Sequence, residues 1–289
     1  MGVQAAVRLP KQGEMTQGTI FSGAVAENYG GCDVAGLVIT ARCDAANDKV
    51  RSYNYIPLVS LSDWLQFDGR LIIAERLQSD SLGKLNNALK QAGFSTSILE
   101  VKTPQDILRG LFPEEATDKK QKQLRASFAT ACDDYGFAAD GFLADDGHTF
   151  CLEAIKRNPG LKSSLMNELV NQKLAGYYFL DRIEPGGPDS GFVALIREIQ
   201  NIPRLLAREI ESGLTIEDYA LLSQQDTSLA SRLRLSAGVA LPVGLLTSPH
   251  IEHLMQVFST LFGRIGIPDP APQYIASLWS RQAGFKETT

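Results

Sequence analysis

Residues 36–61 read GLVITARCDAANDKVRSYNYIPLVSL, and this stretch decides which fold the sequence predicts. Two runs rich in β-branched and aromatic residues, 36–40 and 53–59, are typical of strands. They flank a polar connection, residues 42–49, which holds a thiol, two carboxylates, an amide and two cations. Loops carried on a strand scaffold often hold functional residues, so this connection is the first candidate surface.

The composition is that of an ordinary soluble globular protein. The 289 residues are 44% hydrophobic and 21% charged, enough to bury a core without a metal or a disulfide. The net charge of −5 argues against a protein that mainly grips a nucleic-acid backbone, although it leaves a local basic patch open. The first residues lack the apolar core of a signal peptide, and no apolar stretch is long enough to span a membrane. We therefore expect a cytoplasmic protein with reduced thiols and no membrane partner.

More strands and several helices are predicted outside the opening stretch. Residues 18–25 read as a strand, and from about Ser79 the apolar period changes from two to nearly four, which predicts helices. A glycine- and proline-rich linker, residues 184–190, joins two further apolar runs and predicts a hairpin with a long loop. Pro57 favours an edge strand or a bulge, because proline cannot donate to a strand ladder. The first dozen residues show no period and are expected to fray.

Helix starts are marked by capping residues. Asp80 or Ser81, Thr103 before Pro104, Asp118 and Thr215 are expected at helix starts. The best helix is predicted near the end, with Ser248 as its cap and Pro249 as its first residue. Its apolar arc is expected to seal the core, with two phenylalanines in the middle, Phe258 and Phe262.

The order of strands, helices, strands and a final helix predicts an α+β protein with a small barrel core. Residues 14–78 supply the first strands of the barrel, 79–175 form a helical insertion, and 176–289 supply the remaining strands and the C-terminal helices, the last of which packs on the barrel. Two separate domains are the alternative reading of the same order.

Several segments resemble the PemK/MazF-like toxins. The matching features are the later hairpin, the helix after Leu246-Thr247-Ser248, and three strand segments, Gln17-Gly18-Thr19-Ile20, Gly36-Leu37-Val38-Ile39-Thr40 and Tyr55-Ile56-Pro57-Leu58. The resemblance covers about a third of the chain and implies an SH3-like barrel and ribonuclease activity. The Arg-Pro that this family usually has before its second strand is Val34-Ala35 here, and the helical insertion is foreign to the family.

The polar connection offers candidate catalytic residues. Cys43 would need a stabilised thiolate, which Arg42 or Lys49 could supply, with Asp44 beside it. No histidine is close in sequence to act as a base, and the alternative is a cysteine at a strand end beside an acidic turn. Ligand or partner contacts are expected from Arg42, Cys43, Asp44, Asn47, Asp48, His250 and His253.

A metal site is the weaker hypothesis. Zinc prefers two close pairs of ligands, and only one pair, His148 and Cys151, is present, with Cys132 upstream. A set of aspartates could hold magnesium but is read as solvated loop surface: Asp133, Asp134, Asp140, Asp145 and Asp146. We therefore expect no metal and no cofactor.

The function these features predict is recognition. The leading hypothesis is a non-catalytic adaptor in a multi-protein bacterial system, such as toxin–antitoxin or antiviral defence, with a protein partner. Nucleic acid is a partner that the net charge disfavours. The alternative is an enzyme, either a toxin-like ribonuclease or a thiol-dependent hydrolase centred on Cys43 and Asp44. A pocket that joins Cys43 to a histidine would favour the enzyme.

Overall fold

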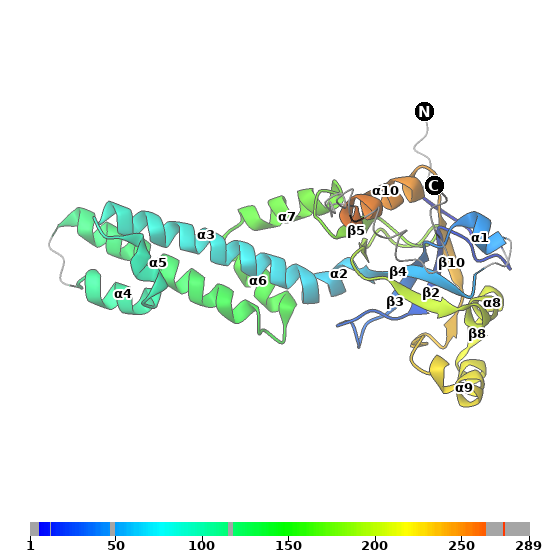
Figure 1. Cartoon of the computed structure of the whole chain (residues 1–289). Helices are drawn as coiled ribbons and strands as arrows, with labels where there is room; N and C mark the ends of the chain where they lie inside the picture. The colour runs from blue at the N-terminus through cyan, green and yellow to red at the C-terminus, as the bar shows by residue number, and fades with distance from the viewer. Residues whose placement is uncertain (1–5, 12, 47–49, 115–117, 264–273, 275–289) are drawn as a thin grey trace, which may run out of the picture.

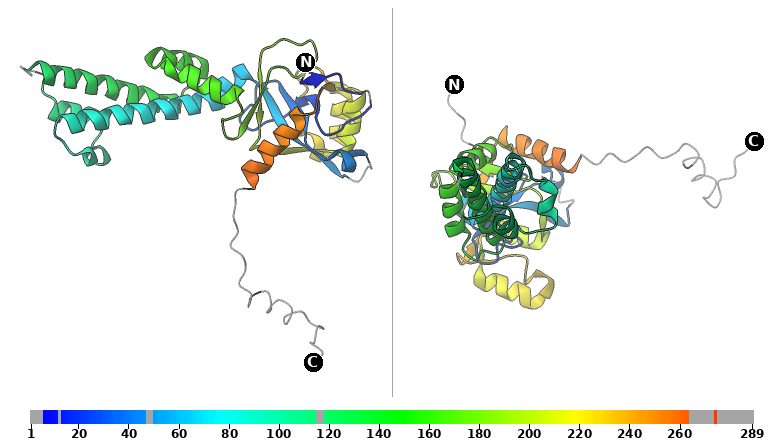
Figure 2. Two further views of the ribbon diagram at one scale, coloured as in Figure 1. Left: turned by 90° about the horizontal axis from the view of Figure 1, so that it is seen from above. Right: turned by 90° about the vertical axis from the view of Figure 1, so that its left-hand side faces the viewer.

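The computed structural model describes residues 6–11, 13–46, 50–114, 118–263 and 274. A sheet forms the body of the molecule, and a long helical arm projects from one side of it (Figure 1). The two further views in Figure 2 show the same projection from above and along the arm. The molecule is therefore elongated, with the sheet at one end.

The sheet is antiparallel and curls into a half-barrel, so the prediction of an α+β protein is confirmed at that level. Its strand order is β1-β10-β2-β3-β4-β6-β5, and β7 also pairs with β4. The strands are β1 Val7–Arg8, β2 Thr19–Ala24, β3 Val34–Val38, β4 Ser52–Ser60, β5 Tyr177–Leu180, β6 Phe192–Leu195, β7 Gln200–Pro203 and β10 Pro242–Leu246. A separate two-stranded ribbon joins β8 Leu214–Thr215 and β9 Val239–Ala240.

Alternating side chains on the strands build an apolar cluster on each face of the sheet. On β3, Leu37 faces the cluster that α10 covers, and Val38 faces the cluster shared with the arm. Both side chains are fully buried, which explains why successive positions of β3 are apolar rather than alternate ones. Gly36 is required between β2 and β4, because an added Cβ would lie 2.4 Å from the ring of Phe21.

β4 is a central strand, so the expectation of an edge position for Pro57 is wrong. β4 pairs with β3 on one side and with both β6 and β7 on the other. The β7 pairing covers residues 52–55 and the β6 pairing covers 58–60, so Pro57 falls in the gap between them. The missing N–H of proline removes no ladder bond at that gap, which allows the residue in a central strand.

The arm consists of helices inserted between β4 and β5. Its elements are α2 Leu61–Trp64, the π-helical turn η1 Leu65–Gly69, α3 Arg70–Gln91, η2 Thr96–Glu100, α4 Pro104–Leu111, α5 Lys119–Gly141, α6 Gly147–Arg157 and α7 Gly160–Val170. The predicted start near Ser81 is therefore wrong, since the helical path begins at Leu61. Ser60 caps it, with Oγ accepting a hydrogen bond from N of Asp63 at 3.0 Å.

The arm is held together by an apolar seam and by ion pairs. α3 and α5 pack along each other through a cluster that includes Leu85, Leu89 and Phe128. Arg76 of α3 makes a two-pronged pair with Glu168 of α7, with N–O distances of 2.9 and 2.7 Å. This fork fixes α7 against α3.

Three of the five aspartates in the predicted set have structural roles. Arg157 binds Asp133 at 2.8 Å and Asp134 at 3.2 Å, and its guanidinium lies 4.2 Å from the ring centre of Phe137. Asp134 is buried, which differs from the predicted solvated surface, and Arg157 compensates its charge. Asp146 caps α6 by accepting a hydrogen bond from N of Thr149, which lowers the pKa of the Asp146 carboxyl.

Two predicted caps, Thr103 and Thr215, and one predicted helix start, Asp118, are confirmed. Thr103 caps α4, Asp118 caps α5, and Thr215 caps α9, Ile216–Gln225, each through a side-chain oxygen that accepts a backbone N–H. The remaining elements near the second half of the sheet are α8 Arg204–Ser212 and the short turn η3 Thr227–Leu229. Capping residues therefore predict helix starts in this sequence even where they do not predict the lengths of the helices.

The final helix, α10 His250–Phe262, begins one residue later than predicted, and no side chain caps it. Ile251 and Leu254 are buried against the sheet, and Phe258 is partly buried. Phe262 is 46% exposed, so the expectation that the whole apolar arc seals the core is wrong for the last turn. Across the part of the chain that the structure describes, no helix has the length and apolarity needed to cross a membrane.

Candidate functional site

The polar connection of the opening stretch begins as a short helix, α1 Arg42–Ala46, rather than as a loop. Arg42, Cys43 and Asp44 are all exposed on it. Sγ of Cys43 lies 3.7 Å from Oδ1 of Asp44, a contact within the helix itself. The other predicted contact residues, Asn47 and Asp48, and the candidate catalytic Lys49 lie outside the described residues.

An ion pair brings two predicted regions together. Nη2 of Arg42 lies 3.9 Å from Oε1 of Glu252, in the first turn of α10. The connection after β3 and the start of the final helix are more than two hundred residues apart in the sequence, yet they lie side by side. Arg42 and the His250–His253 turn therefore belong to one surface.

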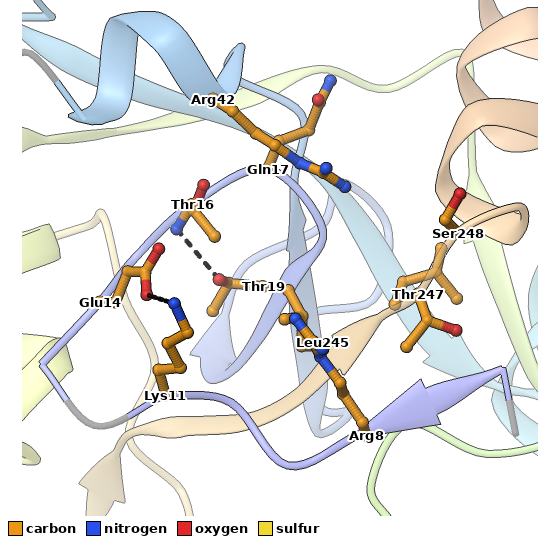
Figure 3. A pocket seen from close by; sticks show the side chains of 11 residues that line it. Arg8, Lys11, Glu14, Thr16, Gln17, Thr19, Arg42, Leu245, Thr247 and Ser248 are labelled. Carbon is orange, nitrogen blue, oxygen red and sulfur yellow. Dashed lines mark hydrogen bonds and ion pairs between the residues drawn. The ribbon is translucent and has the colours of Figure 1, made fainter.

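This surface borders a pocket of about 550 Å³, which we call the cationic pocket. Figure 3 shows Arg42 reaching in from α1, and Arg8 reaching in from β1 on the opposite side. Between them lie hydroxyl and amide side chains. The lining consists of the cations Arg8, Lys11 and Arg42, the carboxylate Glu14, the polar residues Thr16, Gln17, Thr19, Thr247 and Ser248, and the apolar Leu245 and Leu246.

The balance of charge in the cationic pocket is positive. Lys11 is paired with Glu14 at 3.3 Å, so these two charges largely offset each other. Arg42 is held loosely by Glu252, and no ion pair to Arg8 occurs among the described residues. Two guanidinium groups are thus left to face the pocket, and the planar fork of arginine suits carboxylate and phosphate oxygens.

The site is positioned by strand pairing. β1 pairs antiparallel with β10, with Arg8 opposite Leu245, and β10 pairs with β2 at Leu245 and Thr19. Oγ1 of Thr19 accepts a hydrogen bond from N of Thr16 at 3.0 Å, which fixes the turn that carries Gln17. The expectation that the first dozen residues fray is therefore wrong for Val7 and Arg8, since both pair with β10 and Arg8 lines the pocket.

One of the two histidines of α10 has a partner on the sheet. Nδ1 of His253 lies 3.1 Å from the hydroxyl of Tyr178, and the two rings pack edge to face. His250 is partly buried at the start of α10. Among the described residues that line the cationic pocket, neither a histidine nor Cys43 is present. The guanidinium groups of the pocket can bind an anion.

The weak metal candidates are not brought together. Cys132 packs in the arm beside Phe128, whereas Cys151 packs near the sheet with its Sγ 3.6 Å from the carbonyl of Leu65. Nε2 of His148 contacts the carbonyl of Ser62 at 2.8 Å. Burial raises the pKa of both thiols to about 11, which disfavours the thiolate that zinc needs. Nowhere in the described ranges do three His, Cys, Asp or Glu side chains gather in a way that could hold a metal ion.

Sequence reasoning found Arg42 but missed Arg8, Lys11 and Glu14. A two-residue strand, Val7–Arg8, is too short to produce a period, so nothing local marks it. Its position depends on pairing with β10, more than two hundred residues away. Only that long-range pairing places Arg8 opposite Arg42.

Comparison with family models, with curated proteins and with solved structures finds no match to this chain.

Proposed function

We propose that this chain is a non-catalytic, cytoplasmic recognition protein of a multi-protein bacterial system, in which the cationic pocket binds carboxylates of an acidic segment on a protein partner. The observation that carries this proposal is the opposition of Arg8 and Arg42 across a pocket of about 550 Å³. Hydroxyl and amide groups around the two guanidinium groups add hydrogen-bonding capacity for carboxylate oxygens.

A protein partner is favoured over nucleic acid for two reasons. The pocket of about 550 Å³ is sized for a few side chains rather than for an extended backbone. The net charge of −5 repels a long polyanion, whereas a short acidic segment can reach a local basic pocket. We also propose that the curled sheet is a variant of the SH3-like barrel, which is a core often used for binding.

The test uses an array of acidic peptides that differ in the spacing of Asp and Glu, followed by fluorescence anisotropy on those that bind. Arg8→Glu and Arg42→Glu are each expected to weaken the best peptide by about tenfold or more, which is about 1.4 kcal/mol. The matched control is Arg109→Glu, because Arg109 is exposed on α4 of the arm and undergoes the same charge reversal. The three variants should have the same melting temperature as the parent.

Two outcomes overturn the proposal. If no acidic peptide binds the parent more tightly than it binds Arg42→Glu, the cationic pocket is not an acidic-segment site. If Arg109→Glu loses as much affinity as the pocket variants, binding reflects overall charge. RNA or ester hydrolysis by the parent that disappears in Cys43→Ala and Asp44→Ala would replace the adaptor with the ribonuclease or the thiol-dependent hydrolase.

A further inference from the structure

A second pocket, of about 390 Å³, lies where the arm joins the sheet. Its wall is assembled from the β2–β3 connection, the π-helical turn η1, the start of β5 and the turn between β6 and β7. The residues that matter for its chemistry are Tyr29, Asp68, Tyr177, Arg197 and Glu198. We call it the aromatic–acidic pocket. It shares no lining residue with the cationic pocket.

Aromatic rings form and support the floor of this pocket. Tyr29 is only 2% exposed, and its ring packs edge to face on Phe67, with 4.9 Å between ring centres. Tyr177 packs in the same manner on the fully buried Trp64 at 5.3 Å. These contacts fix both phenol rings in place, so the pocket is preorganised.

One buried polar atom of the lining lacks a partner of good geometry. Within the described residues, no group lies at hydrogen-bond distance and angle from Oη of Tyr29. A buried polar group without a partner is costly, and such atoms commonly mark a place where a ligand or water completes the network. The carboxylate of Asp68 is nonetheless near both phenols, since it contributes, after burial, to raising the pKa of Tyr29 and of Tyr177.

The charge of the pocket is negative. Glu27, Asp68 and Glu198 line it against the single cation Arg197. Arg197 is exposed, and its side chain lies over Gly176, where an added Cβ would meet Nε at 2.7 Å. It therefore sits at the rim, and no ion pair to Asp68 occurs among the described residues.

The kind of cation follows from the lining. A divalent metal would need several carboxylates converging on one point, and no such group of three exists among the described side chains. Two neutral phenol rings flanking one carboxylate suit an alkylammonium group instead, because ring faces attract a cation and phenol oxygens accept its N–H bonds.

We propose that the aromatic–acidic pocket binds an alkylammonium group, with Asp68 as its counter-ion, Tyr29 and Tyr177 as its aromatic walls and Oη of Tyr29 as a hydrogen-bond acceptor. The group is supplied either by a free amine or by the lysine side chain of another protein, since both present the same chemistry. This site is independent of the proposed carboxylate-binding function of the cationic pocket.

The test is calorimetric titration of the full chain with two probes, cadaverine for a free amine and N-acetyl-lysine methylamide for a lysine side chain. Saturable binding of at least one probe is expected, and the tighter probe identifies the source. Asp68→Asn keeps the shape and removes the charge, so it should weaken binding by about tenfold or more. Tyr29→Phe removes only the acceptor and should weaken binding by a smaller factor.

The matched control is Glu75→Gln, since Glu75 is exposed on α3 and outside the lining of the pocket. It should bind as the parent does, and so should Arg42→Glu. Glu198→Gln replaces Asp68→Asn if the latter fails to fold, and it too should weaken binding. The proposal is overturned if neither probe binds the parent below about 10 mM, if butanol binds as well as the amines, or if Glu75→Gln loses as much affinity as the pocket variants.

Discussion

Arg42 and Glu252 form an ion pair 3.9 Å long that joins the first residue of α1 to the first turn of α10. Both side chains are 56% exposed, so the pair lies in water rather than in the core. Exposed pairs of this length contribute little to folding stability, because solvent screens them and ordering two long side chains costs entropy. The pair marks where two distant segments meet and leaves Arg42 available to a ligand.

The first prediction follows from that exposure. Arg42→Ala should change the free energy of unfolding by less than about 0.5 kcal/mol, as surface substitutions do. Urea unfolding followed by circular dichroism measures it, with Arg109→Ala as the control. A loss of more than about 1 kcal/mol would show that the pair is structural. Binding lost in Arg42 variants could then no longer be read as a lost ligand contact.

The second prediction concerns two glycines of the arm. An added Cβ at Gly147 would lie 2.1 Å from the backbone oxygen of Gln66, where α6 meets η1, whereas one at Gly83 in α3 would meet nothing within 4 Å. Gly147→Ala should therefore cost about 1–3 kcal/mol or more, because backbone must move. Gly83→Ala should raise stability by about 1 kcal/mol through helix propensity. Equal effects in denaturant titrations would contradict this placement of α6.

Local sequence patterns predict parts of this fold. The run 53–59 predicts a strand because nearly all of its residues are apolar or aromatic, and Thr103 predicts a helix start because its hydroxyl caps Asp106. The start at Leu61 also had a signal, because Oγ of Ser60 accepts a hydrogen bond from N of Asp63 and donates one to the Asp63 carboxylate. Asp68 and Gly69 in the π-helical turn interrupt the apolar period there, which hid the first part of the helical path.

The two pockets could not be predicted from sequence in the same way. Arg8 and Arg42 line one pocket only because β1 pairs with β10, and Tyr29 and Asp68 line the other only because η1 packs beside the β2–β3 connection. Neither pocket is marked by a characteristic residue spacing in the sequence. The polar connection after residue 40 was identified because it holds many polar and charged residues in a short stretch. That density does not reveal which of these residues face a pocket.

The third prediction separates the two halves of α10. Leu254 is fully buried against the sheet, so Leu254→Ala should cost about 2–5 kcal/mol through lost transfer energy and the cavity left behind. Phe262 is 46% exposed and packs on Phe258 at 4.8 Å, so Phe262→Ala should cost about 0.5–1.5 kcal/mol. Chemical denaturation of both variants measures the difference. A greater loss for Phe262→Ala would show that the last turn is buried in solution.

The last prediction concerns two glutamates whose pKa values move in opposite directions. Burial raises the pKa of Glu198, although hydrogen bonds from Gln200 and from the backbone of Glu27 act against it. Ionised Glu198 therefore destabilises the folded state. The stability that protonated Glu198 contributes is fully present below the pKa that the group has in the unfolded chain, and it is lost as pH rises through the pKa in the folded chain. The hydrogen bond from Arg76, helped by Ser164, lowers the pKa of Glu168, so its contribution is present at neutral pH and lost as pH falls.

Glu198→Gln mimics the protonated form and should be more stable than the parent at pH 7, with a difference that shrinks toward pH 4. Glu168→Gln breaks the two-pronged pair with Arg76 and should be less stable than the parent at pH 7, again with a difference that shrinks on acidification. Urea titrations of the parent and both variants at each pH measure the two signs, and the exposed Glu75→Gln should show no difference at either pH. A destabilised Glu198→Gln at pH 7 would mean that its carboxylate is compensated in solution, so the aromatic–acidic pocket would carry less unneutralised negative charge than its lining indicates.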